Sequence, residues 1–205
     1  MTVGTVVVVS GAAPLSAVAL AAVPEDATVI AADAGVDYAR AAGLEVALAV
    51  GDFDSVSELG EVRAERHPRE KDATDLELAL EAAVDLRPQR ILVLSGVGPR
   101  LDHLLVELAL IASPRLAAVE VDAVFASTSV AVVHTERRLS GAVGSLISLV
   151  PMHGPATGVT TDGLVYPLRG ETLERGSSRG ASNEFAEPEA RVSLAGGVLL
   201  ALRPG

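Results

Sequence analysis

Short apolar runs alternate with helical patterns along the first part of the chain. The runs are continuous rather than alternating, which is typical of strands buried on both faces of a parallel sheet. The predicted strands are residues 5–9, 27–32, 46–50, 91–94 and 119–125. Helical spacing of the apolar residues predicts helices over residues 15–22, 36–42, 76–86 and 104–111. This order of elements indicates an α/β open sheet.

The pattern changes near residue 127, where helical spacing gives way to short strand-like segments punctuated by Gly and Pro. The predicted strands here are residues 131–134, 146–150, 164–168, 191–194 and 198–202, with a Gly- and Ser-rich loop over 175–182. We therefore predict two domains. Residues 1–126 form an α/β domain with an open, mainly parallel, Rossmann-like sheet, and residues 127–205 form a small all-β sandwich or barrel.

Composition excludes several classes of function. Hydrophobic residues make up 49% and charged residues 21% of the 205, as in globular proteins. A net charge of -11 argues against a nucleic-acid partner, which normally needs a basic face. The chain has no cysteine, so disulfides and thiol catalysis are impossible. Its apolar stretches are too short for a signal sequence or a membrane span, so we expect a cytoplasmic protein without a membrane partner.

The first candidate site is the acidic run Gly51-Asp52-Phe53-Asp54-Ser55, which follows the third predicted strand. In open α/β sheets, ligands bind beyond the carboxyl ends of the strands, where Asp33 would also lie. In an extended segment, Asp52 and Asp54 would point to one side and Phe53 to the other. Two such carboxylates suit Mg²⁺, which prefers oxygen ligands. The alternative is that both acids cap the next helix in solvent.

Residues 71–75, Lys-Asp-Ala-Thr-Asp, open the next predicted helix. Asp72 can cap this helix, and Asp75 lies in its first turn, where negative charge is favourable. Capping does not account for Lys71, and a lysine beside acids at a helix entrance suits a phosphate contact. We therefore expect Lys71 to face the acidic run and to bind phosphate.

The third candidate segment is Gly96-Val97-Gly98-Pro99-Arg100-Leu101-Asp102-His103, after the fourth predicted strand. A glycine loop lets the backbone approach phosphate, and Arg100 adds a fork of donors. Asp102 can instead be the N-cap of the following helix, and His103 can be a surface residue of its first turn. The segment therefore predicts a phosphate contact at Arg100 and leaves the next two polar residues open.

These three segments occur in the order and context found in thiamine pyrophosphokinases, which the chain resembles over nearly its whole length. Asp33-Ala34-Gly35 is similar to that family's Asp-Gly-Gly turn, and residues 158–168 and 182–184 are similar to motifs of its β domain. The resemblance implies transfer of diphosphate from ATP to thiamine, giving AMP and thiamine diphosphate, with Mg²⁺. It also implies a homodimer, with each active site formed by the α/β domain of one subunit and the β domain of the other.

The resemblance also implies roles for individual residues, carried over by motif match. The metal positions are Asp52, Asp54 and Asp75. The catalytic residues are Asp54, Lys71, Asp75 and Arg100. The residues implied for ATP are Asp33, Gly35, Asp72, Thr74, Gly96 and Arg100. The residues implied for thiamine are Asp102, His103, Tyr166, Ser182 and Asn183. The departures from the family pattern are Ala34, Glu45, Pro99 and Val165, and none of them removes a carboxylate.

Tyr166 offers a stacking face with cation–π attraction for the thiazolium of thiamine; alternatively it is a core strand residue. Ser182 and Asn183 can likewise be ordinary turn residues. Our leading hypothesis is a Mg²⁺-dependent thiamine pyrophosphokinase. The alternatives are a diphosphokinase for another acceptor, such as a hydroxymethylpterin, and a non-catalytic thiamine or nucleotide sensor on the same fold.

Overall fold

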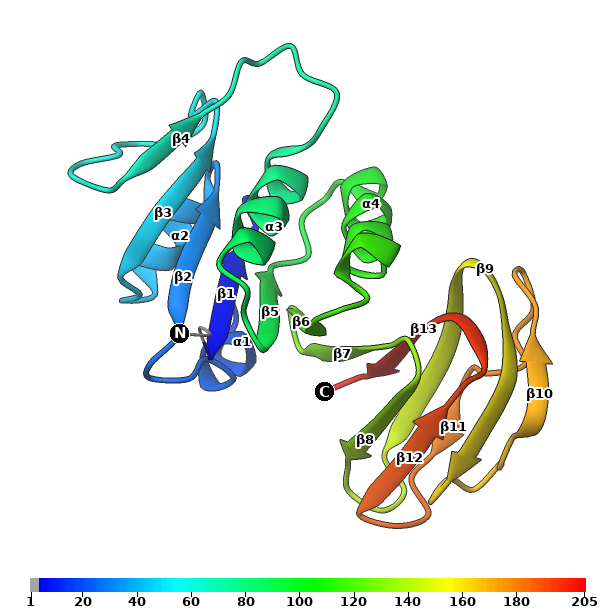
Figure 1. The fold of residues 1–205 in the computed structure, drawn as a ribbon. Helices are drawn as coiled ribbons and strands as arrows, with labels where there is room; N and C mark the ends of the chain where they lie inside the picture. Colours follow the sequence, from blue (N-terminus) through cyan, green and yellow to red (C-terminus); the bar gives the residue numbers. More distant parts are fainter. Residues whose placement is uncertain (1–3) are drawn as a thin grey trace. The chain divides into compact units, whose positions relative to one another are not determined.

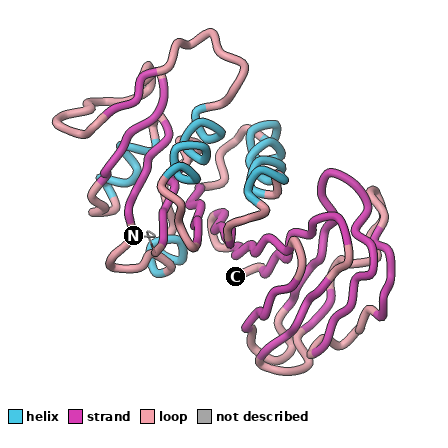
Figure 2. The backbone as a smooth tube through the Cα atoms, in the orientation of Figure 1, coloured by secondary structure: helices cyan, strands magenta, loops and turns pink. Residues whose placement is uncertain are grey.

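The computed structural model describes residues 4–205, which divide into two compact units. The α/β unit comprises Met1–Ile111 and Ala118–Ser127, and the β unit comprises Ala112–Ala117 and Thr128–Gly205. Figure 2 shows that the α-helices of the described residues belong to the α/β unit, whereas strands dominate the β unit. The predicted combination of an α/β fold followed by an all-β fold is confirmed.

Parallel strands form the sheet of the α/β unit. They are β1 (Thr5–Val9), β2 (Thr28–Ala32), β3 (Val46–Gly51), β4 (Ala64–Arg66), β5 (Arg90–Ser95) and β6 (Glu120–Phe125). Their spatial order is β4-β3-β2-β1-β5-β6, and each neighbouring pair is parallel (Figure 1). The central strand β1 is fully buried from Val6 to Val9. Burial on both faces explains why the apolar runs in the sequence are continuous.

Helices cover both faces of this sheet. They are α1 (Ala17–Ala21), α2 (Gly35–Ala41), α3 (Asp75–Asp85) and α4 (Leu101–Ile111). Figure 1 shows α2 behind strands β2 and β3 and α3 in front of the sheet. Successive strand residues point to opposite faces, so Val7 and Val9 pack in one cluster with Val36 of α2. The carboxyl ends of the strands carry the loops that hold the candidate site residues.

The β unit encloses a separate apolar core. Its elements are the 3₁₀ helix η1 (Pro114–Leu116) and the strands β7 (Thr128–Val133), β8 (Glu136–Ser140), β9 (Leu146–Asp162), β10 (Arg169–Leu173), β11 (Asn183–Glu184), β12 (Glu189–Ser193) and β13 (Gly196–Arg203). The long strand β9 pairs antiparallel with β10, β11, β12 and β13. Its fully buried side chains include Ile147 of β9, Leu199 of β13 and Phe185, which directly follows β11.

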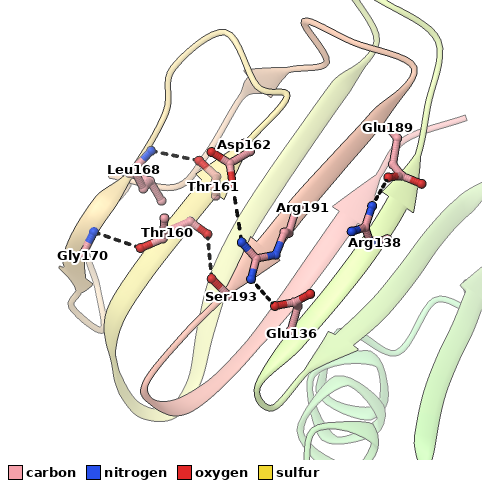
Figure 3. Close-up of polar contacts among 10 residues, drawn as sticks. All are labelled: Glu136, Arg138, Thr160, Thr161, Asp162, Leu168, Gly170, Glu189, Arg191 and Ser193. Atoms are coloured by element: carbon pink, nitrogen blue, oxygen red, sulfur yellow. Dashed lines mark hydrogen bonds and ion pairs between the residues drawn. The ribbon is translucent and has the colours of Figure 1, made fainter.

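Ion pairs cross the solvent face of three of these strands (Figure 3). Arg191 of β12 lies between Glu136 of β8 and Asp162 of β9, with its Nη1 3.8 Å from the Asp162 carboxylate. Arg138 of β8 pairs with Glu189 of β12 at 2.7 Å. Exposed pairs of this kind contribute only about 0–1 kcal/mol each. They are therefore surface features of the strand pairing, and the apolar core is the main source of stability.

Residues 164–168, predicted as a strand, form a turn instead. Leu164 makes a single bridge to Phe185, and no ladder continues from it. The Leu168 N–H donates to the Oγ1 of Thr161 at 2.9 Å, so a side chain takes the place of a strand partner (Figure 3). Leu164 and Leu168 at the two ends of this segment are buried, whereas Val165 and Tyr166 between them are exposed, so its apolar composition resembles that of a strand although no strand forms.

Other strands differ from the prediction in length or were not predicted. The predicted strand 146–150 is the beginning of the 17-residue strand β9. Strands β8 (Glu-Arg-Arg-Leu-Ser) and β10 (Arg-Gly-Glu-Thr-Leu) were missed because polar residues occupy most of their positions. Among residues 4–205, no helix combines the length and the apolar character that a membrane span requires.

Candidate functional site

Three carboxylates gather at the carboxyl ends of β2 and β3. Asp33 follows β2, and Asp52 and Asp54 follow β3. One oxygen from each carboxylate lies within 4.8 Å of the other two. The Oδ1 atom of Asp33 is buried and has no hydrogen-bond partner, which is uncommon for a buried oxygen. A cation would satisfy this atom, so the cluster is a candidate metal site.

The loop after β3 is a turn rather than the extended segment expected from the sequence. Phe53 has φ 62°, a left-handed conformation that is rare for an aromatic residue. The Asp54 N–H donates to Oδ1 of Asp52 at 3.1 Å, and this turn brings the two carboxylates together. Phe53 is buried in the apolar cluster of the sheet, and Asp33 also has a positive φ of 44°. Backbone strain of this kind concentrates at functional sites.

Lys71 and Asp75 complete the acidic corner. The Nζ atom of Lys71 lies 3.0 Å from Oδ1 of Asp75 and 3.6 Å from Oδ2 of Asp52. Lys71 is the only lysine of the chain, and its side chain is 13% exposed. Asp75 comes close to β3 because Gly51, with φ 150°, has no side chain; a Cβ there would lie 3.1 Å from the Asp75 carboxylate. The ammonium therefore lies between acids of two elements.

Burial and charge shift the titration of this corner. Burial raises the pKa of Asp33, and the neighbouring charges of Asp75, Asp52 and Asp54 raise it further. The backbone hydrogen bond from Asp54, followed by the charge of Lys71, lowers the pKa of Asp52. Burial alone would lower the pKa of Lys71, but Asp75 and Asp52 raise it. The acids outnumber the single lysine, which favours a cation beside Asp33.

The start of α3 is fixed by Thr74 rather than by Asp72. The Thr74 Oγ1 accepts a hydrogen bond from the Glu77 N–H at 3.2 Å, and Thr74 is the N-cap residue. Asp72 is two positions too early for that role and is exposed. Asp75 lies in the first turn, as expected, where the helix dipole favours its charge.

Arg100 and Asp102 pair with each other at the start of α4. Both side chains are 63% exposed, and the hydrogen bond from Arg100 lowers the pKa of Asp102. Asp102 lies inside the helix rather than at its N-cap. His103 follows it and is exposed. These polar groups are therefore accessible to a ligand.

Two pockets adjoin one another in the α/β unit. The larger, of about 360 Å³, has among its lining residues Ser10, Asp33, Thr74, Asp75, His103 and Glu107. The smaller, of about 260 Å³, has among its lining residues Gly11, Gly96, Gly98, Arg100, His103 and Glu107. Their volumes are in the range typical of small-molecule sites. The acidic corner borders the larger pocket, and the glycine loop with Arg100 borders the smaller one.

The three predicted residues of the β unit lie around one turn. Tyr166 is 55% exposed and is therefore not a core residue. Asn183 is 5% exposed, and its amide accepts from the Tyr166 N–H at 3.0 Å and donates to the Tyr166 carbonyl at 2.8 Å. Ser182 is exposed with φ 56°, and its N–H donates to Oγ of Ser148 at 3.0 Å. Asn183 therefore holds the backbone of Tyr166, while the phenol ring remains accessible.

Comparison with known families assigns both units. Residues 21–123 match the family model described as thiamin pyrophosphokinase, catalytic domain. Residues 131–199 match the model described as thiamin pyrophosphokinase, vitamin B1 binding domain. The chain belongs to the thiamin pyrophosphokinase family. The family and the enzyme class predicted from the motifs are thereby confirmed.

Individual members of the thiamin pyrophosphokinase family agree with this assignment. The thiamine pyrophosphokinase of Bacillus subtilis (strain 168) is 28% identical over 189 residues, which are 85% of this chain and 86% of the relative. A crystal structure of thiamine pyrophosphokinase from Bacillus subtilis has a TM-score of 0.86 at 25% identity and covers 98% of both chains. A family protein from Enterococcus faecalis has a TM-score of 0.82 at 27% identity, covering 98% of this chain and 99% of that one.

Within the segment that matches the catalytic-domain model, sequence reasoning missed Glu107. This residue of α4 is 6% exposed and lines both pockets. Its carboxylate accepts hydrogen bonds from the hydroxyls of Ser10 and Ser95, the latter at 2.8 Å. One signal was available in the sequence, since Glu107 is the one charged residue in the otherwise apolar stretch from Leu104 to Ala112. An acid on the buried stripe of a helix points to a buried polar network.

Proposed function

We propose that this chain is a Mg²⁺-dependent thiamine pyrophosphokinase. The hydroxyethyl oxygen of thiamine attacks the β-phosphorus of ATP, and the bond from that phosphorus to the oxygen shared with the α-phosphorus breaks. AMP leaves with this oxygen, the hydroxyl proton passes to water, and thiamine diphosphate forms. The observation that carries the proposal is the match of both units to the catalytic and vitamin B1 binding domains of one family.

The residues of the acidic corner fit a Mg²⁺ ion. Asp33, Asp52 and Asp54 offer three oxygens within 4.8 Å of one another, and the buried Oδ1 of Asp33 lacks a partner. Carboxylate oxygens are the type of ligand that Mg²⁺ prefers, so these three residues would hold the ion. When bound, the ion would neutralise charge on the phosphates of ATP. Asp75, predicted as a ligand, lies against Lys71 in this structure and borders the same pocket.

Two cations of the chain suit the phosphates themselves. Lys71 is held by Asp52 and Asp75 with its ammonium largely buried, which fixes a positive charge at the acidic corner. Arg100 lies at the smaller pocket beside the glycine loop, with its guanidinium exposed. Phosphoryl transfer depends on positioning and charge neutralisation rather than on covalent catalysis. Lys71 and Arg100 would therefore supply most of the catalysis that the side chains of this protein contribute.

Tyr166 suits the cationic ring of thiamine. Its ring is exposed, and Asn183 holds its backbone by two hydrogen bonds, so the ring is presented from a fixed turn. Stacking of the thiazolium on the ring would add cation–π attraction. Ser182 lies next to this turn, and Asp102 and His103 are exposed polar residues at the pockets of the α/β unit. We assign these residues to thiamine recognition.

The assay of the purified full-length protein with thiamine, ATP and Mg²⁺ tests the function directly. We expect AMP and thiamine diphosphate in equal amounts, measured by chromatography and mass spectrometry. Asp54→Asn removes one carboxylate of the acidic corner and should lower kcat by roughly 100-fold or more, because several kcal/mol of charge stabilisation depend on the ion. Asp85→Asn, at the exposed end of α3, is the matched control and should retain full activity.

Absence of AMP above background in the wild-type reaction would overturn the proposed function. Product formed from a hydroxymethylpterin but not from thiamine would identify a different acceptor. Binding of thiamine without turnover would instead identify a sensor.

We also propose a homodimer in which each active site combines the α/β unit of one subunit with Tyr166 of the partner. The side chains of Val165 and Tyr166 are exposed although they are apolar and aromatic, which supports a contact with another subunit at this surface. Asp54→Asn and Tyr166→Ala subunits should each be poorly active alone. After mixing and exchange, hybrid dimers would hold one intact site, and about a quarter of the wild-type activity should return. A mixture no more active than its components would exclude a shared site.

A further inference from the structure

The sheet of the α/β unit changes direction between β1 and β5. Strands β2 and β3 follow on one side of β1, and the chain then crosses to β5 and β6 on the other side. In open parallel sheets, ligands bind in the crevice beyond the carboxyl ends of the two strands at such a switch point. Here β1 is followed by Ser10, and β5 ends at Ser95. Both serines are nearly fully buried.

Glu107 of α4 lies at this switch point. It is 6% exposed, and its two carboxylate oxygens accept hydrogen bonds from the hydroxyls of Ser10 and Ser95. An apolar side chain would pack at such a position without the cost of burying a charge. The carboxylate therefore joins the ends of the two central strands to one helix.

The loops that follow these two strands lie against each other. The Ser10 oxygen accepts a hydrogen bond from the Ala12 N–H at 3.3 Å, which ties the first loop to the Glu107 network. A Cβ on Gly96 would lie 2.5 Å from the carbonyl oxygen of Pro14, and a Cβ on Gly98 would lie 2.7 Å from that of Ala12. Both glycines are therefore required for this close approach, so displacement of one loop would displace the other.

Glu107 also borders both pockets of the site. Gly11, Ala12, His103 and Glu107 are common to the two, while the acidic corner lies at one pocket and Arg100 at the other. A nucleotide that contacts both regions would pass along the loops that Glu107 holds. Because a carboxylate repels phosphate, and because both of its oxygens are already hydrogen-bonded, Glu107 would act through these loops rather than by contact.

We propose that Glu107 is a positioning residue of the nucleotide site: by accepting hydrogen bonds from Ser10 and Ser95 it fixes the two glycine loops and thereby sets the affinity for ATP. This inference rests on the proposed function only in taking ATP as the nucleotide. It predicts a larger effect on ATP than on thiamine. Of the residues proposed for thiamine, Tyr166, Ser182 and Asn183 belong to the β unit. Asp102 and His103 lie on α4 with exposed side chains, which have no hydrogen bond to the Glu107 carboxylate.

Two substitutions separate hydrogen bonding from charge. Glu107→Leu keeps the approximate size and removes both acceptors. Glu107→Gln can keep the network, since its oxygen accepts from Ser10 and its NH₂ donates to Ser95, whose hydroxyl can then donate to the Gly96 carbonyl 3.0 Å away. Ile111→Ala, at a fully buried position one turn further along α4, is the control for general destabilisation of the helix.

Affinity is measured by calorimetry on the full chain with Mg²⁺ and a non-hydrolysable ATP analogue, so that no turnover is needed. We expect Glu107→Leu to raise Kd roughly 10- to 100-fold, as small displacements of positioning groups do, while KM for thiamine stays within about threefold. Glu107→Gln should rescue most of the affinity. Ile111→Ala should lower the melting temperature without a comparable rise in Kd.

Several results would overturn the inference: a wild-type protein that does not bind the analogue, an unchanged Kd in Glu107→Leu, Glu107→Gln as weak as Glu107→Leu, or an equal loss in Ile111→Ala. A wild type that binds the analogue but forms no thiamine diphosphate would refute the proposed function alone and leave the role of Glu107 standing.

Discussion

Removal of the single lysine of the chain is the sharpest test of the acidic corner. The Nζ atom of Lys71 lies 3.0 Å from the carboxylate of Asp75 and 3.6 Å from that of Asp52. The side chains of Lys71, Asp75 and Asp52 are 13%, 24% and 17% exposed, respectively. At an effective dielectric constant of about 20, each contact is worth about 5 kcal/mol of gross Coulomb attraction. Desolvation offsets most of this, so Lys71→Met should lower the free energy of unfolding by about 2 kcal/mol.

The same substitution should lower kcat by about 100-fold or more, since a fixed cation is lost from the phosphate side of the site. It should also enlarge the rise in melting temperature on adding Mg²⁺, because the ion then faces carboxylates without a competing ammonium. Lys71→Arg keeps the charge and should retain more activity than Lys71→Met. Urea unfolding and the AMP assay measure the two effects. A kcat within threefold of wild type in Lys71→Met would refute the placement of Lys71 at the phosphates.

Asn183→Asp should raise KM for thiamine by roughly tenfold with little change in KM for ATP, because a carboxylate cannot donate to the Tyr166 carbonyl as the amide does at 2.8 Å; equal changes in both constants by steady-state kinetics would contradict this. For His134, burial lowers the pKa in the folded chain, so the unfolded chain binds more protons below neutral pH and stability must fall as pH drops through that range. His134→Gln should reduce this fall by at most about 1.4 kcal/mol per pH unit in urea unfolding, and an identical pH dependence would show that His134 is not responsible.

The α/β sheet was predictable because burial on both faces leaves its strands as continuous apolar runs, as in Val6 to Val9. The β unit was less predictable because several of its strands, such as β8 and β10, consist mostly of polar residues and lack a continuous apolar run. Residues 164–168 have the composition of a strand, yet the Thr161 hydroxyl closes a turn there. Conversely, β8 is a strand of mostly charged residues that is held by its partner β12, and such pairing is not visible from one segment alone.

The part of the candidate site that lies at the ends of the parallel strands was predictable from the sequence. The topology alone places Asp33 and Asp52 at one edge, because β2 and β3 are parallel neighbours. The partners of each acid depend on finer geometry. Asp75, which the motif match implies as a metal position, contacts Lys71 at 3.0 Å, and oxygens of Asp33, Asp52 and Asp54 lie within 4.8 Å of one another. The left-handed backbone of Phe53 and the hydrogen bond from the Asp54 N–H to Asp52 belong to a turn that the sequence does not reveal.

Glu107 is an example of a pocket residue that sequence motifs do not identify. It belongs to no phosphate-binding motif, and its partners Ser10 and Ser95 are 97 and 12 residues away in the sequence. Only the order of the strands makes these serines neighbours, since β1 and β5 pair in parallel although α1 to α3 separate them along the chain. The sequence shows that Glu107 is an acid in an apolar helical stretch. Its role can be inferred only when the structure shows that it contacts the ends of β1 and β5. Glu107 is therefore recognised from the topology of the sheet, whereas the proposed phosphate-binding residues are recognised from motifs.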